Sequence, residues 1–152
     1  MNRIYAKEII SWRYEGDLAI YNLDDNEETL TEILTKDYYG VIDGKENLIG
    51  FFCTGDAAIV PYGKQFNVYD DTNFLDIKIG IKPELIGKRK GFPFVKFCLD
   101  FLKKNDKVRQ FRLTVGDFNK KAISVYHEVG FIISNYFQSE SGSYYLVMTL
   151  ID

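Results

Sequence analysis

The sequence predicts an α/β (α+β) domain in which helices pack on a mixed β-sheet. Hydrophobic spacings typical of helices and of strands alternate along the chain. The 152 residues suit one domain, so we expect a single domain over 1–152. Hydrophobic residues make up 46% of the chain and aromatic residues 16%, which is enough to fill a core and excludes global disorder.

The first third of the chain is predicted to be helical. A short helix is expected after Ala6 and should include Trp12. A second helix should begin at the acidic run 24–28, because acidic side chains in a first turn favour the positive end of the helix dipole. Its apolar residues follow the i, i+3, i+4 spacing of one amphipathic stripe, namely Leu30, Ile33 and Leu34.

The hydrophobic period then changes to two, which predicts strands. Residues 38–42 and 48–53 are expected to form a hairpin, because the segment 43–46 between them reads Asp-Gly-Lys-Glu and favours a turn. The stretch 57–72 has mixed character. A third strand is predicted over 74–81.

The remaining elements alternate between helix and strand. Asn119 is a good helix N-cap, and Gly130 stands where a helix C-terminal glycine belongs. The order ααβββαβαββ predicts a mixed sheet with helices packed on it. The expected elements are a helix over 93–102, a strand over 111–115, a helix between Asn119 and Gly130, and strands over 131–137 and 144–150.

Composition excludes several classes of function. The net charge is −3, whereas a general nucleic-acid-binding protein usually has a strongly basic face. No apolar run approaches the roughly 20 residues of a membrane helix, and the first ten residues lack a signal-peptide core, so we expect no membrane and a cytoplasmic location. Two cysteines and one histidine give neither a disulfide framework nor a metal site.

The most informative segment is the predicted strand, turn and helix over 75–102. Its turn reads Gly87-Lys88-Arg89-Lys90-Gly91, which combines flexible backbone, three cations and the positive end of a following helix. An anion such as phosphate or pyrophosphate is the expected ligand, and a solvated loop without a ligand is the alternative. The P-loop and dinucleotide-binding patterns both fail, since the glycine spacing is wrong and Phe92 stands after the second glycine.

A second block lies downstream and reads Asn119-x-x-Ala122-x-x-x-Tyr126-x-x-x-Gly130-Phe131. Together with Ile81-x-Pro83-Glu84-x-x-Gly87-Lys88-x-x-Gly91, it resembles the GNAT superfamily of acyl-coenzyme A dependent N-acyltransferases. The order and spacing match from about Phe74 to Phe131, and the flanking strands also fit. The resemblance implies a GNAT-like, mostly antiparallel central sheet flanked by helices, with two central strands that splay apart.

The resemblance also implies a co-substrate, acetyl-CoA. In the family, the loop equivalent to 86–92 wraps the pyrophosphate with backbone N–H groups, and the preceding strand pairs its backbone with the pantetheine arm. The asparagine that matches Asn119 contacts the pantetheine. The implied cofactor-binding residues are Ile79, Gly80, Ile81, Ile86, Gly87, Lys88, Arg89, Lys90, Gly91, Phe92 and Asn119.

The loop departs from the family pattern at two positions. Ile86 replaces the usual polar residue and Arg89 replaces a glycine. A non-glycine residue at positive φ costs about 1 kcal/mol. Arg89 either compensates with a charge-assisted bond to the pyrophosphate, or marks weak cofactor binding or a repurposed pocket.

The resemblance places Tyr126 near the sulfur, where it is the candidate general acid for the departing thiolate. An alkyl amine has a pKa of about 10.4, so a base or a water relay must help it lose a proton. Some relatives carry a glutamate where this chain has Thr114, so Asp76 is the next candidate base. A backbone N–H near Ile81 is the candidate oxyanion donor. The alternatives are a core role for Tyr126 and a solvent-facing Asp76.

The acceptor side is least defined by the sequence. In the family, the segment equivalent to 12–21 often helps to build it, and the predicted substrate-binding residues here are Trp12, Tyr14 and Glu15. Aromatic and carboxylate groups suit a cationic amine, but they also suit an ordinary helix–sheet contact.

We therefore expect an acetyl-CoA-dependent N-acetyltransferase that acts on a small-molecule or protein amino group, and we leave a homodimer open. The alternatives are a non-catalytic acyl-CoA-binding or anion-binding domain and a domain that serves a protein contact.

Overall fold

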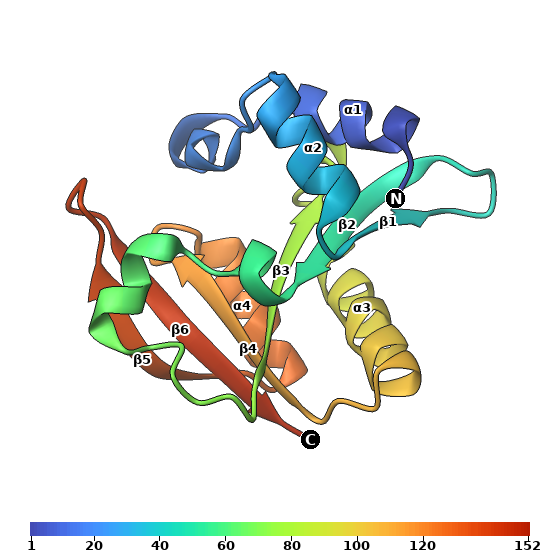
Figure 1. The fold of residues 1–152 in the computed structure, drawn as a ribbon. Helices are drawn as coiled ribbons and strands as arrows, with labels where there is room; N and C mark the ends of the chain where they lie inside the picture. The colour runs from blue at the N-terminus through green and yellow to red at the C-terminus, as the bar shows by residue number, and fades with distance from the viewer.

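The computed structural model describes residues 1–152 and contains one six-stranded sheet, with strand order β1-β2-β3-β4-β6-β5 (Figure 1). Neighbouring strands are antiparallel except β3 and β4, which are parallel. The predicted mixed, mostly antiparallel sheet is therefore confirmed. The strands are β1 (Tyr38–Ile42), β2 (Leu48–Thr54), β3 (Leu75–Ile81), β4 (Gln110–Gly116), β5 (Ile132–Gln138) and β6 (Tyr144–Ile151).

The helices and strands follow the predicted order, and short 3-10 helices lie between them. None of the helices has the length and apolar character that a membrane crossing requires. The α-helices are α1 (Arg3–Ser11), α2 (Glu27–Thr35), α3 (Gly91–Asn105) and α4 (Lys120–Val129). The 3-10 helices are η1 (Gly16–Tyr21), η2 (Gly55–Ala58), η3 (Pro61–Phe66) and η4 (Pro83–Leu85).

The first helix differs from its prediction at both ends. It begins earlier because the Asn2 side chain caps it, accepting a hydrogen bond from the Tyr5 amide at 2.8 Å. It ends at Ser11, because Trp12 adopts an extended conformation with ψ of 138°. Trp12 is therefore the first residue of a connecting segment that leads into η1.

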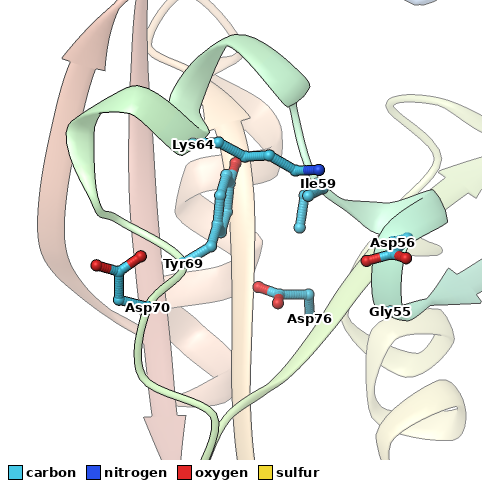
Figure 2. Close-up of a pocket in the computed structure, with 7 residues that line it drawn as sticks. All are labelled: Gly55, Asp56, Ile59, Lys64, Tyr69, Asp70 and Asp76. Atoms are coloured by element: carbon cyan, nitrogen blue, oxygen red, sulfur yellow. The ribbon is translucent and has the colours of Figure 1, made fainter.

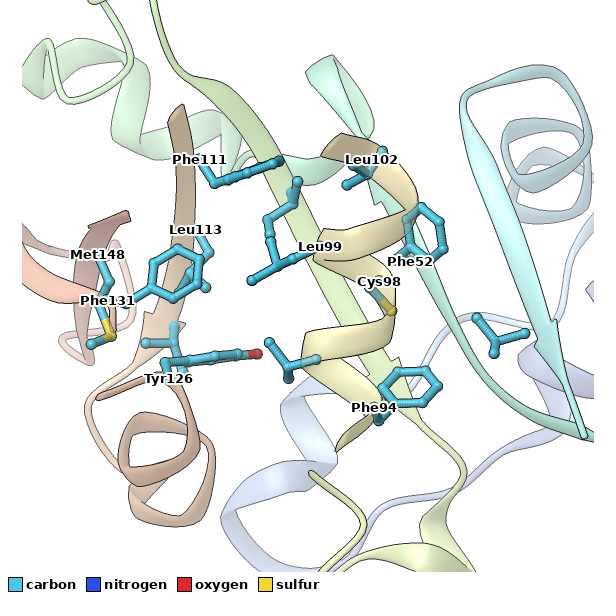
Figure 3. Packing of buried hydrophobic residues seen from close by; sticks show 14 residues of the cluster. Phe52, Phe94, Cys98, Leu99, Leu102, Phe111, Leu113, Tyr126, Phe131 and Met148 are labelled. Carbon is cyan, nitrogen blue, oxygen red and sulfur yellow. The ribbon is translucent and has the colours of Figure 1, made fainter. Parts of the chain in front are cut away.

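Helices cover both faces of the sheet. Helices α1 and α2 pack on one face of β1 and β2, and α3 and α4 pack on the opposite face. The larger core cluster lies under α3 and α4, and Figure 3 shows its members filling the space between these helices and the sheet. Its most completely buried large side chains include Leu99, Leu102, Phe111 and Phe131.

Successive residues of strand β3 point to opposite faces of the sheet. Ile77, Ile79 and Ile81 pack against the core under α3 and α4. Gly80 points the other way, where a Cβ atom would lie only 2.2 Å from Cε1 of Phe51. This position therefore needs a residue without a side chain.

Strands β3 and β4 separate after three paired residues. The pairs are Leu75 with Phe111, Asp76 with Arg112, and Ile77 with Leu113. Each strand is seven residues long, so the ends Lys78–Ile81 and Thr114–Gly116 do not pair with each other. The two strands diverge in Figure 1, and the predicted splay is confirmed.

Candidate active site

The splay exposes backbone groups of β3. The amide of Lys82 donates to the carbonyl of Ile49 in β2, so even-numbered residues of this strand point their backbone groups toward β2. By alternation, the backbone groups of Ile79 and Ile81 point toward the gap left by β4. Backbone groups of β3 therefore face the gap, whereas in a complete sheet they would hydrogen-bond to β4.

The loop before α3 adds further free backbone donors. Gly87 and Arg89 both lie in the left-handed region, with φ of 79° and 58°. The amides of Gly87, Arg89 and Lys90 donate to no backbone carbonyl, and the first turn of α3 has no side-chain cap. Arg89 thus adopts a conformation that favours glycine, and the loop leaves donors free beside the positive end of a helix.

Positive charge surrounds these donors. Lys88, Arg89 and Lys90 are all exposed. Lys121 also belongs to this region, because its Nζ atom would lie 3.2 Å from a Cβ atom placed on Gly87. A cation in the first turn of a helix opposes the helix dipole, and a bound anion would offset that repulsion. No local pattern in the sequence marks Lys121, because only the fold brings α4 to this loop.

Close packing joins the two sequence blocks. A Cβ atom on Gly91 would lie 3.0 Å from Cγ2 of Val125, so this glycine lets the start of α3 approach α4. In α4, the predicted cap is confirmed, since the Asn119 side chain accepts a hydrogen bond from the Ala122 amide at 3.4 Å. The C-terminal glycine is confirmed as well, because Gly130 has φ of 123°.

Tyr126 combines features of both of its alternative roles. Its ring lies in the core, 8% exposed and 5.9 Å from the Phe131 ring between centroids. Burial raises the pKa of its phenol above the ordinary value, with smaller contributions from Tyr21 and Cys98. In Figure 3 the hydroxyl points from α4 toward α3. The phenol therefore keeps its proton at neutral pH.

Asp76 lies in an ion pair. Its Oδ1 accepts a hydrogen bond from Nε of Arg112 at 2.7 Å, and its Oδ2 accepts one from Nη2 at 2.9 Å. The guanidinium also donates to the carbonyls of Tyr69 and Asp71. The candidate base Asp76 is thus neither unpaired nor turned to solvent, because Arg112 lies directly across the β3–β4 junction.

The hollow beside this ion pair has a volume of about 330 Å³ (Figure 2). Tyr69 lines this hollow, and its hydroxyl lies 2.7 Å from the hydroxyl of Thr114. Thr114, in the part of β4 that does not pair with β3, therefore has a hydrogen-bond partner. The lining residues are Gly55, Asp56, Ile59, Lys64, Tyr69, Asp70 and Asp76.

The segment before α2 contacts both separated strands. The Tyr14 hydroxyl donates to the carbonyl of Ile81 at 2.8 Å, and the Tyr21 hydroxyl accepts from the amide of Gly116 at 3.2 Å. Glu15 is exposed. Trp12 is instead buried against Phe51, and its indole N–H has no hydrogen-bond partner.

No family model and no curated protein matches the sequence. Solved structures do match. One is a chimera of the Vibrio cholerae spermidine N-acetyltransferase SpeG and hSSAT, with 19% identity, a TM-score of 0.71, and coverage of 99% of this chain and 92% of that one. Another is a GNAT-family acetyltransferase from Bacillus anthracis, with 13% identity, a TM-score of 0.74, and coverage of 99% and 91%. With its strand order and splayed parallel pair, the chain has the GNAT fold.

Proposed function

We propose that this protein is an N-acetyltransferase that moves the acetyl group of acetyl-CoA to a primary amine of a small molecule or a protein. The observation that carries the proposal is the gap between β3 and β4 beside a cationic loop with free amides. The fold supports it, because the similar structures include N-acetyltransferases.

The residues of the loop fit a diphosphate. Residues Ile86–Phe92 would bind it with backbone amides, and Lys88, Arg89 and Lys121 would supply charge. The backbone of Ile79 would hydrogen-bond to the pantetheine arm, which is an amide chain. Ile81, whose carbonyl already accepts from Tyr14, would lie beside the acyl group. Gly80 and Asn119 would flank the same arm.

Acetyl-CoA supplies an activated thioester. The amine nitrogen forms a bond to the carbonyl carbon, the C–S bond breaks, and the nitrogen loses one proton while the sulfur takes up another. Tyr126 is the proposed proton donor to sulfur, because the family resemblance places this tyrosine near the sulfur and its phenol carries a proton at neutral pH. The amide of Ile81, which faces the gap, would stabilise negative charge on the carbonyl oxygen.

On the acceptor side, Tyr14 and Glu15 remain the proposed contacts for the amine, and Trp12 anchors their segment in the core. Both carboxylate oxygens of Asp76 are occupied by Arg112, so we assign proton removal from the amine to a water relay. Asp76 then serves to join β3 to β4.

Thermal unfolding with acetyl-CoA tests the proposal first. Ligand at 100 times its dissociation constant should stabilise the protein by about 2.7 kcal/mol. Turnover is then tested with a panel of amines that includes spermidine, by measuring the free thiol that each reaction releases. Tyr126→Phe should lower kcat while the acetyl-CoA-induced shift persists. Absence of any shift at millimolar acetyl-CoA would contradict the proposal.

A non-catalytic acyl-CoA-binding domain is the second candidate. The bond between Thr114 and Tyr69 favours it, because no acidic group occupies that position. A thermal shift with acetyl-CoA, combined with no thiol release from any amine in the panel, would support this second function.

A further inference from the structure

We propose that Tyr21 is a positioning residue for the acceptor amine, held at the open end of β4 by the backbone of Gly116. This inference rests on the proposed acetyltransferase function. Gly116 is the last residue of β4 and belongs to the part that does not pair with β3. Its amide donates to the Tyr21 hydroxyl at 3.2 Å, across a separation of 95 residues.

Packing fixes this contact. The Tyr21 and Phe118 rings lie 6.0 Å apart between centroids. The Phe118 ring also lies against Gly116, where a Cβ atom would come within 2.3 Å of its Cε1. Gly116, Phe118 and Tyr21 thus form one packed unit at the end of the strand, so the position of the Tyr21 hydroxyl is determined by the fold.

The Tyr21 hydroxyl faces the gap between β3 and β4. The amide of Asp117, the residue after β4, donates to the carbonyl of Tyr144 on the β6 side. By alternation, the amide of Gly116 points to the opposite side, where β3 has already separated from β4. The Tyr21 hydroxyl that accepts from this amide therefore lies beside the gap, where the proposed acetyl donor and acceptor would meet.

The hydrogen-bonding capacity of Tyr21 differs from that of Tyr14. Tyr14 donates its only hydroxyl proton to the carbonyl of Ile81, whereas Tyr21 only accepts a bond, from Gly116. A hydroxyl oxygen has a second lone pair, which can accept an N–H of a neutral amine. That contact would aim the lone pair of the amine nitrogen toward the gap while the nitrogen remains free to attack.

Steady-state kinetics of Tyr21→Phe tests the inference, since this change removes the oxygen and keeps the ring against Phe118. We expect kcat/KM for the amine to fall about tenfold, with an unchanged KM for acetyl-CoA and an unchanged melting temperature. Tyr5→Phe is the matched control. It removes a hydroxyl that donates to the backbone carbonyl of Glu46, in the turn between β1 and β2, and should leave kinetics unchanged.

Two results would overturn the inference while the proposed function stands. One is wild-type kcat/KM in Tyr21→Phe for every amine that the wild-type protein accepts. The other is a lower kcat/KM for the amine that comes together with a higher KM for acetyl-CoA and a lower melting temperature. That result would show that Tyr21 has a structural role only. A wild-type protein that binds no acetyl-CoA and releases no thiol would instead overturn the proposed function, and this inference with it.

Discussion

The two junctions that β4 makes with its neighbours differ in length. With β6 it pairs along all seven residues, from Gln110 with Ile151 to Gly116 with Tyr145. With β3 it pairs over only three, although β3 is just as long. The complete junction uses its backbone groups to hold the sheet together. In the incomplete one, the backbone groups of Ile79 and the amide of Ile81 bond to no strand on the β4 side, while the Ile81 carbonyl accepts from Tyr14. The candidate site is thus a place where the sheet is left unfinished.

The incomplete junction is held differently at its two ends. At the closed end, the charged pair of Asp76 and Arg112 spans directly opposed residues. At the open end, hydroxyls of Tyr14 and Tyr21 bond to the backbone of the separated strands. Removing the ion pair at the closed end should therefore lower stability most, whereas removing the Tyr21 hydroxyl at the open end should affect function.

Breaking the ion pair should have the largest effect. Asp76→Ala leaves the buried guanidinium of Arg112 without its partner, which should lower the free energy of unfolding by about 3–5 kcal/mol. Urea denaturation measures the change. The double variant Asp76→Leu with Arg112→Leu should recover much of the loss, because no unpaired charge remains. Wild-type stability in Asp76→Ala would show that the pair does not hold the junction.

Adding a methyl group to β3 should have the next largest effect. In Gly80→Ala, the new Cβ atom would overlap the Phe51 ring, and such overpacking costs about 1–3 kcal/mol. Thermal unfolding should show a lower melting temperature. Gly44→Ala is the control, because no atom lies within 4 Å of its Cβ position. Equal melting temperatures for the two variants would contradict the tight packing of β3.

Neutralising the loop should have a moderate effect on binding alone. Replacing Lys88, Arg89 and Lys90 with glutamine should raise the Kd for acetyl-CoA about tenfold, by loss of charge-assisted contacts. Calorimetry at two salt concentrations measures it, and the salt dependence should weaken as well. Lys104→Gln, at the other end of α3, is the control. A Kd unaffected by the triple change would exclude this loop as the diphosphate site.

The smallest effect at neutral pH concerns Tyr14. Burial, and then Glu84, raises its pKa to about 12, whereas an unfolded tyrosine has a pKa of about 10. The unfolded state thus loses its proton first, so this stabilisation is complete below pH 10 and is lost as the pH rises toward 12. In urea denaturation between pH 9 and pH 11, Tyr14→Phe should show a shallower decline in stability. An identical dependence of stability on pH in the wild-type protein and Tyr14→Phe would contradict the raised pKa of the Tyr14 phenol.

Local signals explain what the sequence could predict. The cap at Asn119 and the helix C-terminal glycine at Gly130 each depend on a few neighbouring residues, and both are confirmed. The charged partner of Asp76 was missed because alternation alone makes Arg112 look like one residue of a solvated face. In the structure, the segment that contains Tyr69 and Asp71 covers that face.

Long-range contacts explain the rest. The bond between Tyr21 and Gly116 joins residues 95 positions apart, and no local pattern encodes it. The same holds for Lys121, which reaches the loop only because α3 packs on α4. The splay itself was predicted through the family resemblance, since nothing in the composition of either strand marks where the pairing stops.

Amide hydrogen exchange with and without acetyl-CoA tests the central claim most directly. If the gap receives the pantetheine and the loop receives the diphosphate, acetyl-CoA should slow exchange at Ile79, Ile81 and the amides of 87–92. Exchange along the β4–β6 junction should stay as it was. Slowed exchange elsewhere, with Ile79 and Ile81 unchanged at saturating acetyl-CoA, would contradict the account.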